Sequence, residues 1–244
     1  MANSRALFGR VGQAVFLDKE PGAKPSGTEM RTRLVVGTVL LLTWIAYVGL
    51  AAEQLASRPT AEWIKTLDAP DRIAGLKVGE VIARLKIAPG QSIADLGAGT
   101  GAFTVPMAKA VGPSGKVYAV EIDKGLVDHI AHKAADAKMT NVQALLGKPM
   151  DPEIPGQVDL LFMHDVLHHI ADRPEYLARV VRYLKPGGRF AIIDPTPAAT
   201  PHRGEPKLIV SKDQAGTWMK EAGLVAQDEV QLFADKWFVV YGRK

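Results

Sequence analysis

Cysteine is absent from the 244 residues of this sequence. Its absence excludes disulfide bonds, thiolate zinc sites and cysteine nucleophiles together, and it leaves the redox environment open. Aromatic residues are also scarce, at 7%, and the chain carries no internal repeat or low-complexity tract. With 47% hydrophobic and 23% charged residues, the composition is nevertheless that of a globular protein with a packed core.

A strong net charge is missing as well, since the formal value is only +4. Residues 1–33 form a basic N-terminal tail with a net charge of +3, which leaves +1 for all the residues that follow. A nucleic-acid-binding face needs a concentrated stripe of Lys and Arg. The near-neutral body therefore predicts a protein with no nucleic-acid partner.

The longest apolar run covers residues 34–52, which read LVVGTVLLLTWIAYVGLAA and carry no charge. A helix of this length measures about 28 Å, close to the hydrocarbon thickness of a bilayer. A buried core helix is disfavoured, because a core helix of this length rarely lacks a polar face. We expect the run to be a transmembrane helix or uncleaved signal anchor that holds the protein in a membrane.

A cleaved secretory signal is the main alternative for this run. Residues 30–33 read Met-Arg-Thr-Arg, which resembles a translation start with a short basic region, and residues 49–51 offer a small-x-small cleavage site. In that case the true start would be Met30 rather than Met1. Cleavage is disfavoured because the apolar run exceeds the usual length of roughly 7–15 residues for a signal peptide.

The remainder of the chain divides into a linker and one large domain. Residues 53–69 read as a polar juxtamembrane linker in which Thr60 could cap a short helix. Residues 70–244 alternate between strand and helix patterns, beginning with a helical spacing of apolar residues from Ile73 to Leu85. The expected strands are 92–95, 116–121, 142–146, 158–164 and 189–194, with helices at about 102–111, 124–138 and 173–184.

This alternation predicts an α/β fold with a doubly wound, mostly parallel sheet covered by helices on both faces. The end of the chain departs from the pattern, because residues 224–233 and 236–241 are two apolar runs joined by a short turn. They indicate a C-terminal antiparallel hairpin that closes the sheet. Asp172 to Glu175 has the pattern of a helix N-cap, with a Pro in the first turn, and we assign it to structure alone.

The strongest functional motif lies at residues 93–101, Ile-Ala-Asp-Leu-Gly-Ala-Gly-Thr-Gly. A strand ends in an acid, and a loop with three glycines then opens a helix. Glycines are needed where the backbone turns tightly and a ligand approaches without a Cβ in the way. Asp95 ends the strand at the edge where open α/β sheets bind ligands, and its carboxylate could hold a cationic ammonium group.

A glycine loop alone does not identify its ligand, because Gly97, Gly99 and Ala102 also fit the dinucleotide pattern G-x-G-x-x-A. Dinucleotide folds usually have apolar residues leading into the loop, whereas Asp95 stands two residues before Gly97 here. A dinucleotide-binding fold has two mononucleotide-binding halves, whereas this chain is expected to end in a hairpin where the second half would be. These features favour a methyltransferase over a nicotinamide-dependent dehydrogenase.

The sequence resembles the class I S-adenosylmethionine-dependent methyltransferases, in particular the ubiquinone/menaquinone C-methyltransferase-like and "type 11" domains. The resemblance covers about residues 70–244, and it implies a seven-stranded sheet that binds S-adenosylmethionine. It rests on four segments in family-like order and spacing: residues 95–101, residues 117–123, residues 159–161 with 166–170, and residues 184–189.

Glu121 ends the second strand, where its two carboxylate oxygens could accept both hydroxyls of a ribose. The family usually places Gly-Asp after the third strand to hold the adenine, but this chain has Lys148 there, so adenine would be held by backbone groups, by Asp151 or against Met150. The residues expected to bind the cofactor are Asp95, Gly97, Ala98, Gly99, Thr100, Gly101, Glu121, Ile122, Lys148 and Asp165.

A cluster of His164, Asp165, His168 and His169 follows the fourth strand. His164 and His168 are candidate catalytic residues, because histidine accepts a proton near neutral pH. The pairs 164/168 and 165/169 also have the i,i+4 spacing of metal ligands on a helix, but no further ligand cluster is evident, so no metal is expected. On the long loop that follows residue 194, His202 and Arg203 are candidate substrate contacts.

The expected function is methyl transfer from S-adenosylmethionine to a small, lipid-like or membrane-associated acceptor. A non-catalytic S-adenosylmethionine-binding protein is the alternative from another class. Seven basic residues flank the apolar run, four before it and three after it, so charge counting does not fix the orientation. The cytoplasmic face is slightly preferred because the cofactor is made in the cytoplasm, and the sequence leaves the acceptor and the oligomeric state open.

Overall fold

The computed structural model describes residues 58–243. The basic tail, the apolar run 34–52 and the first residues of the linker lie outside this range, so the membrane span stays a prediction. Within residues 58–243, no helix is long and apolar enough to cross a bilayer.

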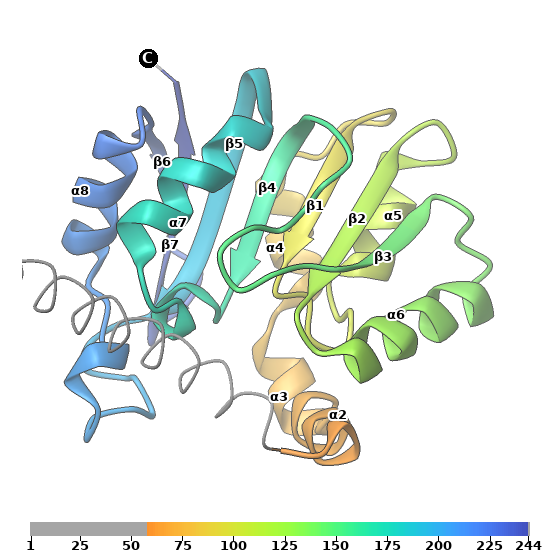
Figure 1. The fold of residues 1–244 in the computed structure, drawn as a ribbon, viewed down its shortest axis with the longest axis horizontal. Coiled ribbons are helices and arrows are strands. Elements are labelled where there is room, and N and C mark those ends of the chain that lie inside the picture. The colour runs from red at the N-terminus through yellow and green to blue at the C-terminus, as the bar shows by residue number, and fades with distance from the viewer. Residues whose placement is uncertain (1–57, 244) are drawn as a thin grey trace, which may run out of the picture. The chain divides into compact units, whose positions relative to one another are not determined.

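A seven-stranded sheet in the order β3-β2-β1-β4-β5-β7-β6 forms the centre of the domain (Figure 1). All neighbouring strands pair in parallel except β7, which is antiparallel to both β5 and β6. The mixed sheet with a C-terminal antiparallel hairpin confirms the fold expected from the sequence. The strands are β1 (Ser92–Leu96), β2 (Lys116–Glu121), β3 (Val142–Leu146), β4 (Val158–His164), β5 (Leu184–Pro195), β6 (Val225–Glu229) and β7 (Lys236–Gly242).

Helices cover both faces of the sheet, with α7 and α8 on the near face in Figure 1 and α4 and α5 behind it. The helix α6 packs against β2 and β3. The α-helices are α2 (Thr60–Leu67), α3 (Pro70–Gly75), α4 (Val78–Leu85), α5 (Thr104–Val111), α6 (Lys124–Asp136), α7 (Arg173–Val180) and α8 (Lys212–Glu221). Short 3-10 turns occur at η1 (Leu167–His169), η2 (Val181–Tyr183) and η3 (Pro206–Leu208).

The central strands are buried on both sides because each face carries its own apolar layer. Leu161 of β4 packs into the layer under α7 and α8, whereas its neighbours Leu160 and Phe162 belong to the layer under α4 and α5. All three side chains are fully buried. This is why the strand reads as a continuous apolar run rather than an alternating one.

Two local predictions for the helices are wrong in detail. The apolar spacing from Ile73 to Leu85 forms two helices rather than one, because α3 ends at Gly75 and Lys77 adopts a left-handed conformation with φ of 49°. Thr60 is not the N-cap of α2: that position belongs to Pro59, and the Thr60 hydroxyl donates a hydrogen bond to Asp123 Oδ1 at 3.1 Å.

The N-cap predicted at Asp172 is confirmed. Its carboxylate accepts a hydrogen bond from the amide of Glu175, and Pro174 stands in the first turn of α7.

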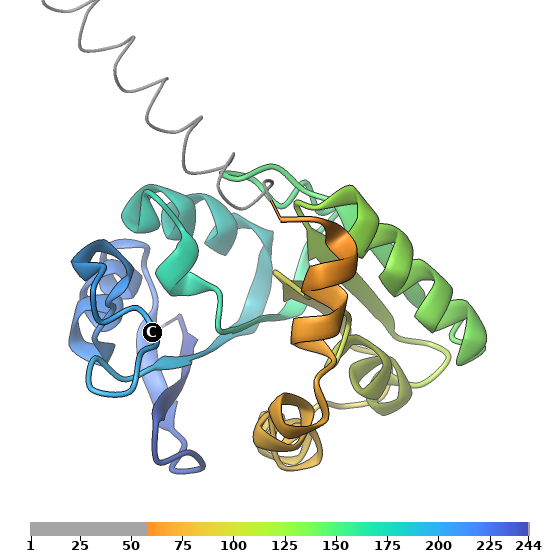
Figure 2. The ribbon, with the colours of Figure 1, turned by 90° about the horizontal axis from the view of Figure 1, so that it is seen from below.

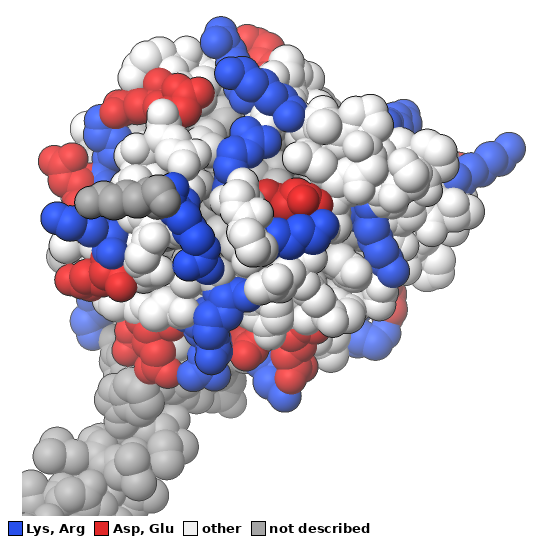
Figure 3. All heavy atoms as spheres, turned by 90° about the horizontal axis from the view of Figure 1, so that it is seen from above, with Lys and Arg blue, Asp and Glu red and all other residues white. Residues whose placement is uncertain are grey.

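Figure 2 views the domain from the side where α2 and α3 lie, which is also where the parallel strands end. The opposite side, shown in Figure 3, carries Lys and Arg interspersed with Asp and Glu. Open α/β sheets bind their ligands at the carboxyl ends of the strands, which is the side where α2 and α3 lie.

We expect Leu161→Ala to lower the free energy of unfolding by about 2–5 kcal/mol, because it leaves a cavity in a fully packed layer. Leu146→Ala is the matched control, since Leu146 ends β3 with 49% of its surface exposed and should cost less than about 1 kcal/mol. Denaturant unfolding of both variants measures the difference. Equal losses would contradict the burial described for β4.

Candidate functional site

The glycine loop predicted from the sequence leaves β1 beside the neighbouring strand β2. The amides of Gly97 and Ala98 both donate to the carbonyl of Val120, at 2.9 and 3.0 Å. These bonds fix the loop at the carboxyl ends of β1 and β2, next to the point where the strand order reverses between β1 and β4. Open α/β sheets bind their ligands at this position.

The backbone conformation of the loop favours glycine at all three positions. Gly97, Gly99 and Gly101 all have left-handed φ values, of 67°, 59° and 74°. A Cβ on Gly97 would lie 2.5 Å from Cγ2 of Val166 in the segment after β4, and one on Gly99 would lie 3.3 Å from Leu67. The loop therefore fits tightly between two other parts of the chain.

A cavity of about 610 Å³ opens beside this loop. Its volume is within the range of pockets that hold small ligands. The structure places nine of the ten residues predicted to bind the cofactor on its wall: Asp95, Gly97, Ala98, Gly99, Thr100, Glu121, Ile122, Lys148 and Asp165. Gly101 does not line it, because it lies against Ile130 and Thr104 and serves the turn into α5.

Asp95 is buried between Ala119 of β2 and Phe162 of β4. Its Oδ2 accepts a hydrogen bond of 2.7 Å from the hydroxyl of Thr104. Burial raises the pKa of Asp95 to about 7; the bond from Thr104 opposes this rise, and the nearby Glu121 adds to it. A buried carboxyl of this kind gains most from a cationic ligand group that restores its charged form.

Glu121 connects the end of β2 to the glycine loop. Its Oε1 accepts the amide of Gly99 at 2.7 Å, and its Oε2 accepts the amide of Ile122 at 2.9 Å. Burial raises the pKa of Glu121, while these amide bonds oppose the rise. Each carboxylate oxygen has a second lone pair, so both remain able to accept a ligand hydroxyl.

The helices α2 and α3 supply a wall of the cavity that the sequence did not predict. Trp63 and Leu67 line it from α2, although we placed them in the linker. Asp68, just after α2, accepts a 2.6 Å hydrogen bond from the hydroxyl of Thr100 in the glycine loop. The i,i+4 pair of apolar residues 63 and 67 was the available signal. The domain boundary at residue 70 stays a prediction.

The loop after β3 lines the cavity with residues that include Lys148, Pro149 and Met150. The Lys148 side chain forms an ion pair with Glu153 at the surface. Asp151 is not on the cavity wall; its carboxylate accepts a 2.6 Å hydrogen bond from the hydroxyl of Tyr183. Of the groups considered for the adenine, the structure therefore leaves backbone groups and Met150. Ile122, whose side chain is 42% exposed, also lines the cavity.

His164 ends β4 and lines the cavity with a buried ring. The ring packs against Phe103, with centroids 5.1 Å apart, and its Nδ1 lies 3.3 Å from Asp165 Oδ2. Its Nε2 has no hydrogen-bond partner within the described part of the chain. A buried imidazole nitrogen without a partner is costly, so a polar ligand group that came within hydrogen-bond distance would stabilise it.

Asp165 holds His164 from a left-handed position with φ of 56°, and it is itself held by Lys236, whose Nζ lies 2.6 Å from Oδ1. Burial would raise the pKa of Asp165. The hydrogen bond and charge of His164, together with Lys236, outweigh burial and lower this pKa below its usual range. Because Asp165 stays ionised, the neutral form of the His164 ring keeps its proton on Nδ1, next to the carboxylate, and has its lone pair on Nε2.

His168 is buried behind the cavity wall, and its Nδ1 lies 2.9 Å from Asp194 Oδ1. The α-helical turn considered for a metal site in residues 164–169 does not form, because only η1 is helical and Asp165 is left-handed. The neighbouring His169 lines the cavity instead. Burial, and then the charges of His168 and His202, lower the pKa of His169 to about 3, so its ring is neutral.

Arg203 and His202, the candidate substrate contacts on the loop after β5, are not on the cavity wall. The Arg203 guanidinium donates to the carbonyl of Ala198 within its own loop. The ring of His202 lies 5.3 Å from those of both His168 and His169, centroid to centroid. The sequence did not predict this approach, because His202 is more than thirty residues away along the chain.

Together these groups form one concave site with two chemical halves. The first half offers backbone amides and two acids, Asp95 and Glu121, to a ligand that carries an ammonium group and vicinal hydroxyls. The second half joins the buried His164 to apolar side chains of α2 and of the segment after β4. A site of this kind can bring a polar nucleoside compound and an apolar partner into contact while excluding water.

Comparison with known proteins identifies the family. Residues 87–231 match the family model described as "Methyltransferase domain". The solved structure of a SAM-dependent methyltransferase from Aquifex aeolicus is similar to 75% of this chain and 98% of its own, with a TM-score of 0.67 and 25% sequence identity.

Two curated relatives are similar over shorter segments. The nocamycin O-methyltransferase of Saccharothrix syringae is 34% identical over 110 residues, which cover 45% of this chain and 39% of the relative. The demethylmenaquinone methyltransferase of Symbiobacterium thermophilum is 33% identical over 117 residues, which cover 47% of each protein. The chain thus spans less than half the length of these relatives. With the family match and the fold in agreement, the chain belongs to the methyltransferase domain family, and its domain is of the S-adenosylmethionine-dependent class.

Proposed function

We propose that this chain transfers a methyl group to a small, quinone-like acceptor that reaches the site from a membrane. The observation that carries the proposal is that one cavity joins the glycine loop to an apolar wall next to His164. The name of the demethylmenaquinone methyltransferase relative supports an acceptor of this class. The name of the nocamycin O-methyltransferase supports an oxygen of the acceptor as the atom that receives the methyl group.

The residues around the glycine loop fit S-adenosylmethionine, which supplies a methyl group already activated on a sulfonium. Asp95 would hold the ammonium of its amino-acid part, directly or through water, and Glu121 would accept the ribose hydroxyls. Ile122 and Met150 would pack against the adenine. The glycines allow the loop to adopt the left-handed conformations that bring its backbone to the cavity wall.

The acceptor would occupy the apolar part of the cavity, beside Trp63, Leu67 and Val166. An aromatic ring gains free energy when it leaves water for such surroundings. These side chains would hold the acceptor in line with the carbon–sulfur bond. Alignment of two bound reactants accounts for much of the rate acceleration in a transfer of this kind.

His164 is the residue we propose as the general base. As the acceptor atom forms its bond to the methyl carbon, the carbon–sulfur bond breaks and its electron pair stays on sulfur. The acceptor proton then passes to Nε2 of His164, the nitrogen without a partner in the described residues. Asp165 stabilises the imidazolium that results through its 3.3 Å contact with Nδ1.

The proposed membrane anchor at residues 34–52 explains how an apolar acceptor would reach the cavity. Only residues 53–59 separate that run from α2. Seven residues span at most about 25 Å when fully extended. If residues 34–52 cross a bilayer, a linker of this length would keep the start of α2 near the membrane that holds the acceptor.

The proposal is tested by methyl transfer from labelled S-adenosylmethionine with the full chain in lipid vesicles. We expect label in a naphthoquinol that carries an isoprenoid tail, and at least tenfold less in the same ring without a tail. His164→Gln should lower kcat by roughly 100-fold or more with little change in cofactor affinity. His132→Gln, on the exposed side of α6, is the matched control with normal kcat. Exclusive methylation of water-soluble acceptors would refute the membrane-substrate proposal.

Cofactor affinity should also depend on pH through Asp95, whose pKa burial raises to about 7. A bound ammonium group favours the ionised carboxylate, so binding below pH 7 requires the loss of a proton. Affinity for S-adenosylhomocysteine should therefore fall roughly tenfold from pH 8 to pH 6. Asp95→Asn should bind more weakly and with no such slope in a calorimetric titration. The same slope in both proteins would assign the dependence to another group.

A further inference from the structure

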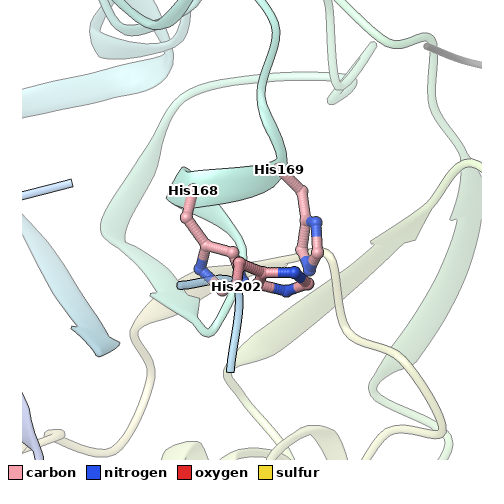
Figure 4. Close-up of side chains that lie close together, drawn as sticks. All are labelled: His168, His169 and His202. Carbon is pink, nitrogen blue, oxygen red and sulfur yellow. The ribbon is translucent and has the colours of Figure 1, made fainter. Parts of the chain in front are cut away.

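Three histidines meet beside the cavity although they come from two separate segments. His168 and His169 belong to η1, and His202 lies on the loop after β5 (Figure 4). One ring nitrogen from each lies within 4.8 Å of the others. The ring centroids are 4.0 Å apart for the neighbouring pair and 5.3 Å from each of these to His202. Figure 4 shows the three rings turned toward one another.

Two of the three rings are oriented by carboxylates. Nδ1 of His168 lies 2.9 Å from Asp194 Oδ1, and Nδ1 of His202 lies 3.3 Å from Glu205 Oε1. A carboxylate that accepts a hydrogen bond from Nδ1 keeps the ring proton on that nitrogen and leaves the lone pair on Nε2. Metal-bound histidines in proteins are commonly held by a carboxylate or carbonyl on the nitrogen that does not bind the metal.

The burial of the Asp194–His168 pair is the second observation that points to a ligand. Asp194 is fully buried, and its Oδ2 has no hydrogen-bond partner among the residues that the structure describes. His168 is also buried, with only 4% of its surface exposed. A buried carboxylate with an unpaired oxygen is stabilised by positive charge nearby, and a dication on the far side of His168 would supply it.

We propose that His168, His169 and His202 bind a divalent transition-metal ion of the zinc class. Imidazole is a preferred ligand of such ions, whereas Mg²⁺ and Ca²⁺ prefer oxygen. Two nitrogens about 2.0–2.1 Å from a tetrahedral ion are about 3.3 Å apart, so the rings would move inward by roughly an ångström. His202 can make this movement because it lies on a surface loop.

The proposed ion would lie at the edge of the cavity, because His169 also lines the cavity wall. Three protein ligands leave the fourth position of a tetrahedral ion open, as in catalytic rather than structural zinc sites. Water or an oxygen of a bound compound could occupy that position. The metal site is independent of the proposed acceptor, since methyl transfer itself requires no metal.

The competing explanation is that three neutral imidazoles simply pack together. The two explanations differ in what the full chain does when it meets a metal ion. The protein should be produced without a polyhistidine tag, stripped with a chelator, and titrated with Co²⁺ and then Zn²⁺. We expect Co²⁺ to bind one per chain with the strong visible absorption of a tetrahedral site, and Zn²⁺ to displace it.

His202→Gln is the main test variant, because its position on a loop makes loss of the fold easy to avoid and to detect. It should weaken Zn²⁺ binding at least tenfold, about 1.4 kcal/mol. Asp194→Asn should weaken it by roughly 10- to 100-fold through the orientation of His168. His132→Gln on α6 is the matched control and should bind Zn²⁺ as the unaltered chain does. Circular dichroism and S-adenosylhomocysteine affinity check the fold of each variant.

The proposal is overturned if a correctly folded His202→Gln variant binds Zn²⁺ as tightly as His132→Gln. It is overturned equally if Co²⁺ gives only the weak absorption of an octahedral, solvent-exposed ion. Neither outcome involves methyl transfer, so failure of the metal site leaves the proposed acceptor untouched. Conversely, a chain that binds Zn²⁺ as expected but methylates no quinone would refute the acceptor alone.

Discussion

The hydrogen bond between Glu121 and the amide of Gly99, 2.7 Å long, is the contact on which the site depends. It joins the end of β2 to the loop that leaves β1, and it holds a carboxylate and a left-handed glycine in fixed register. A hydrogen bond to a charged group contributes about 1.5–3 kcal/mol. Because the same carboxylate faces the cavity, the contact that shapes the loop also presents the acid to a ligand.

Around this contact, the loop is held from three further directions. Val166 leaves no room for a Cβ at Gly97, Asp68 binds the hydroxyl of Thr100, and Lys133 donates to the Thr100 carbonyl at 3.1 Å. The loop therefore has its binding conformation before any ligand arrives. Preorganisation of this kind reduces the entropy lost on binding. It also connects the glycine loop to α2, the helix that seven residues separate from the predicted membrane span.

Burial acts in the same direction on the pKa values of Asp95 and Asp165, but their neighbours differ, so the two pKa values are shifted in opposite directions. Burial raises the pKa of Asp95 to about 7, whereas His164 and Lys236 keep that of Asp165 low despite burial. Asp95 therefore responds to a cationic ligand, while Asp165 remains a fixed negative charge behind His164. In the function we propose, Asp95 would serve cofactor binding and Asp165 would serve proton transfer.

Much of the fold could be predicted from the sequence because the signals are local. The strands β2, β3 and β4 match the predicted ranges to the residue, since each is a short apolar run bounded by turns. The glycine loop and Glu121 could also be identified from the sequence. The glycines follow one another within a few residues, and Glu121 is the acid at the end of an apolar run. The C-terminal hairpin followed from two apolar runs joined by a short turn.

The parts that could not be predicted depend on contacts between distant segments. Trp63 and Leu67 were placed in a linker, because only the folded structure brings α2 to the glycine loop. Gly101 was assigned to the cofactor site on the motif alone, whereas its surroundings place it against α5 and α6. The approach of His202 to His168 and His169 arises from the path of a long loop, which no spacing in the sequence encodes.

The central claim is that Glu121 and the glycine loop hold the cofactor. It is tested most directly by calorimetric titration of the full chain with S-adenosylhomocysteine, comparing Glu121→Ala with Glu221→Ala on the exposed side of α8. The account predicts that Glu121→Ala lowers the affinity at least tenfold, about 1.4 kcal/mol, and that Glu221→Ala leaves it unchanged. Equal affinities in the two folded variants would contradict it.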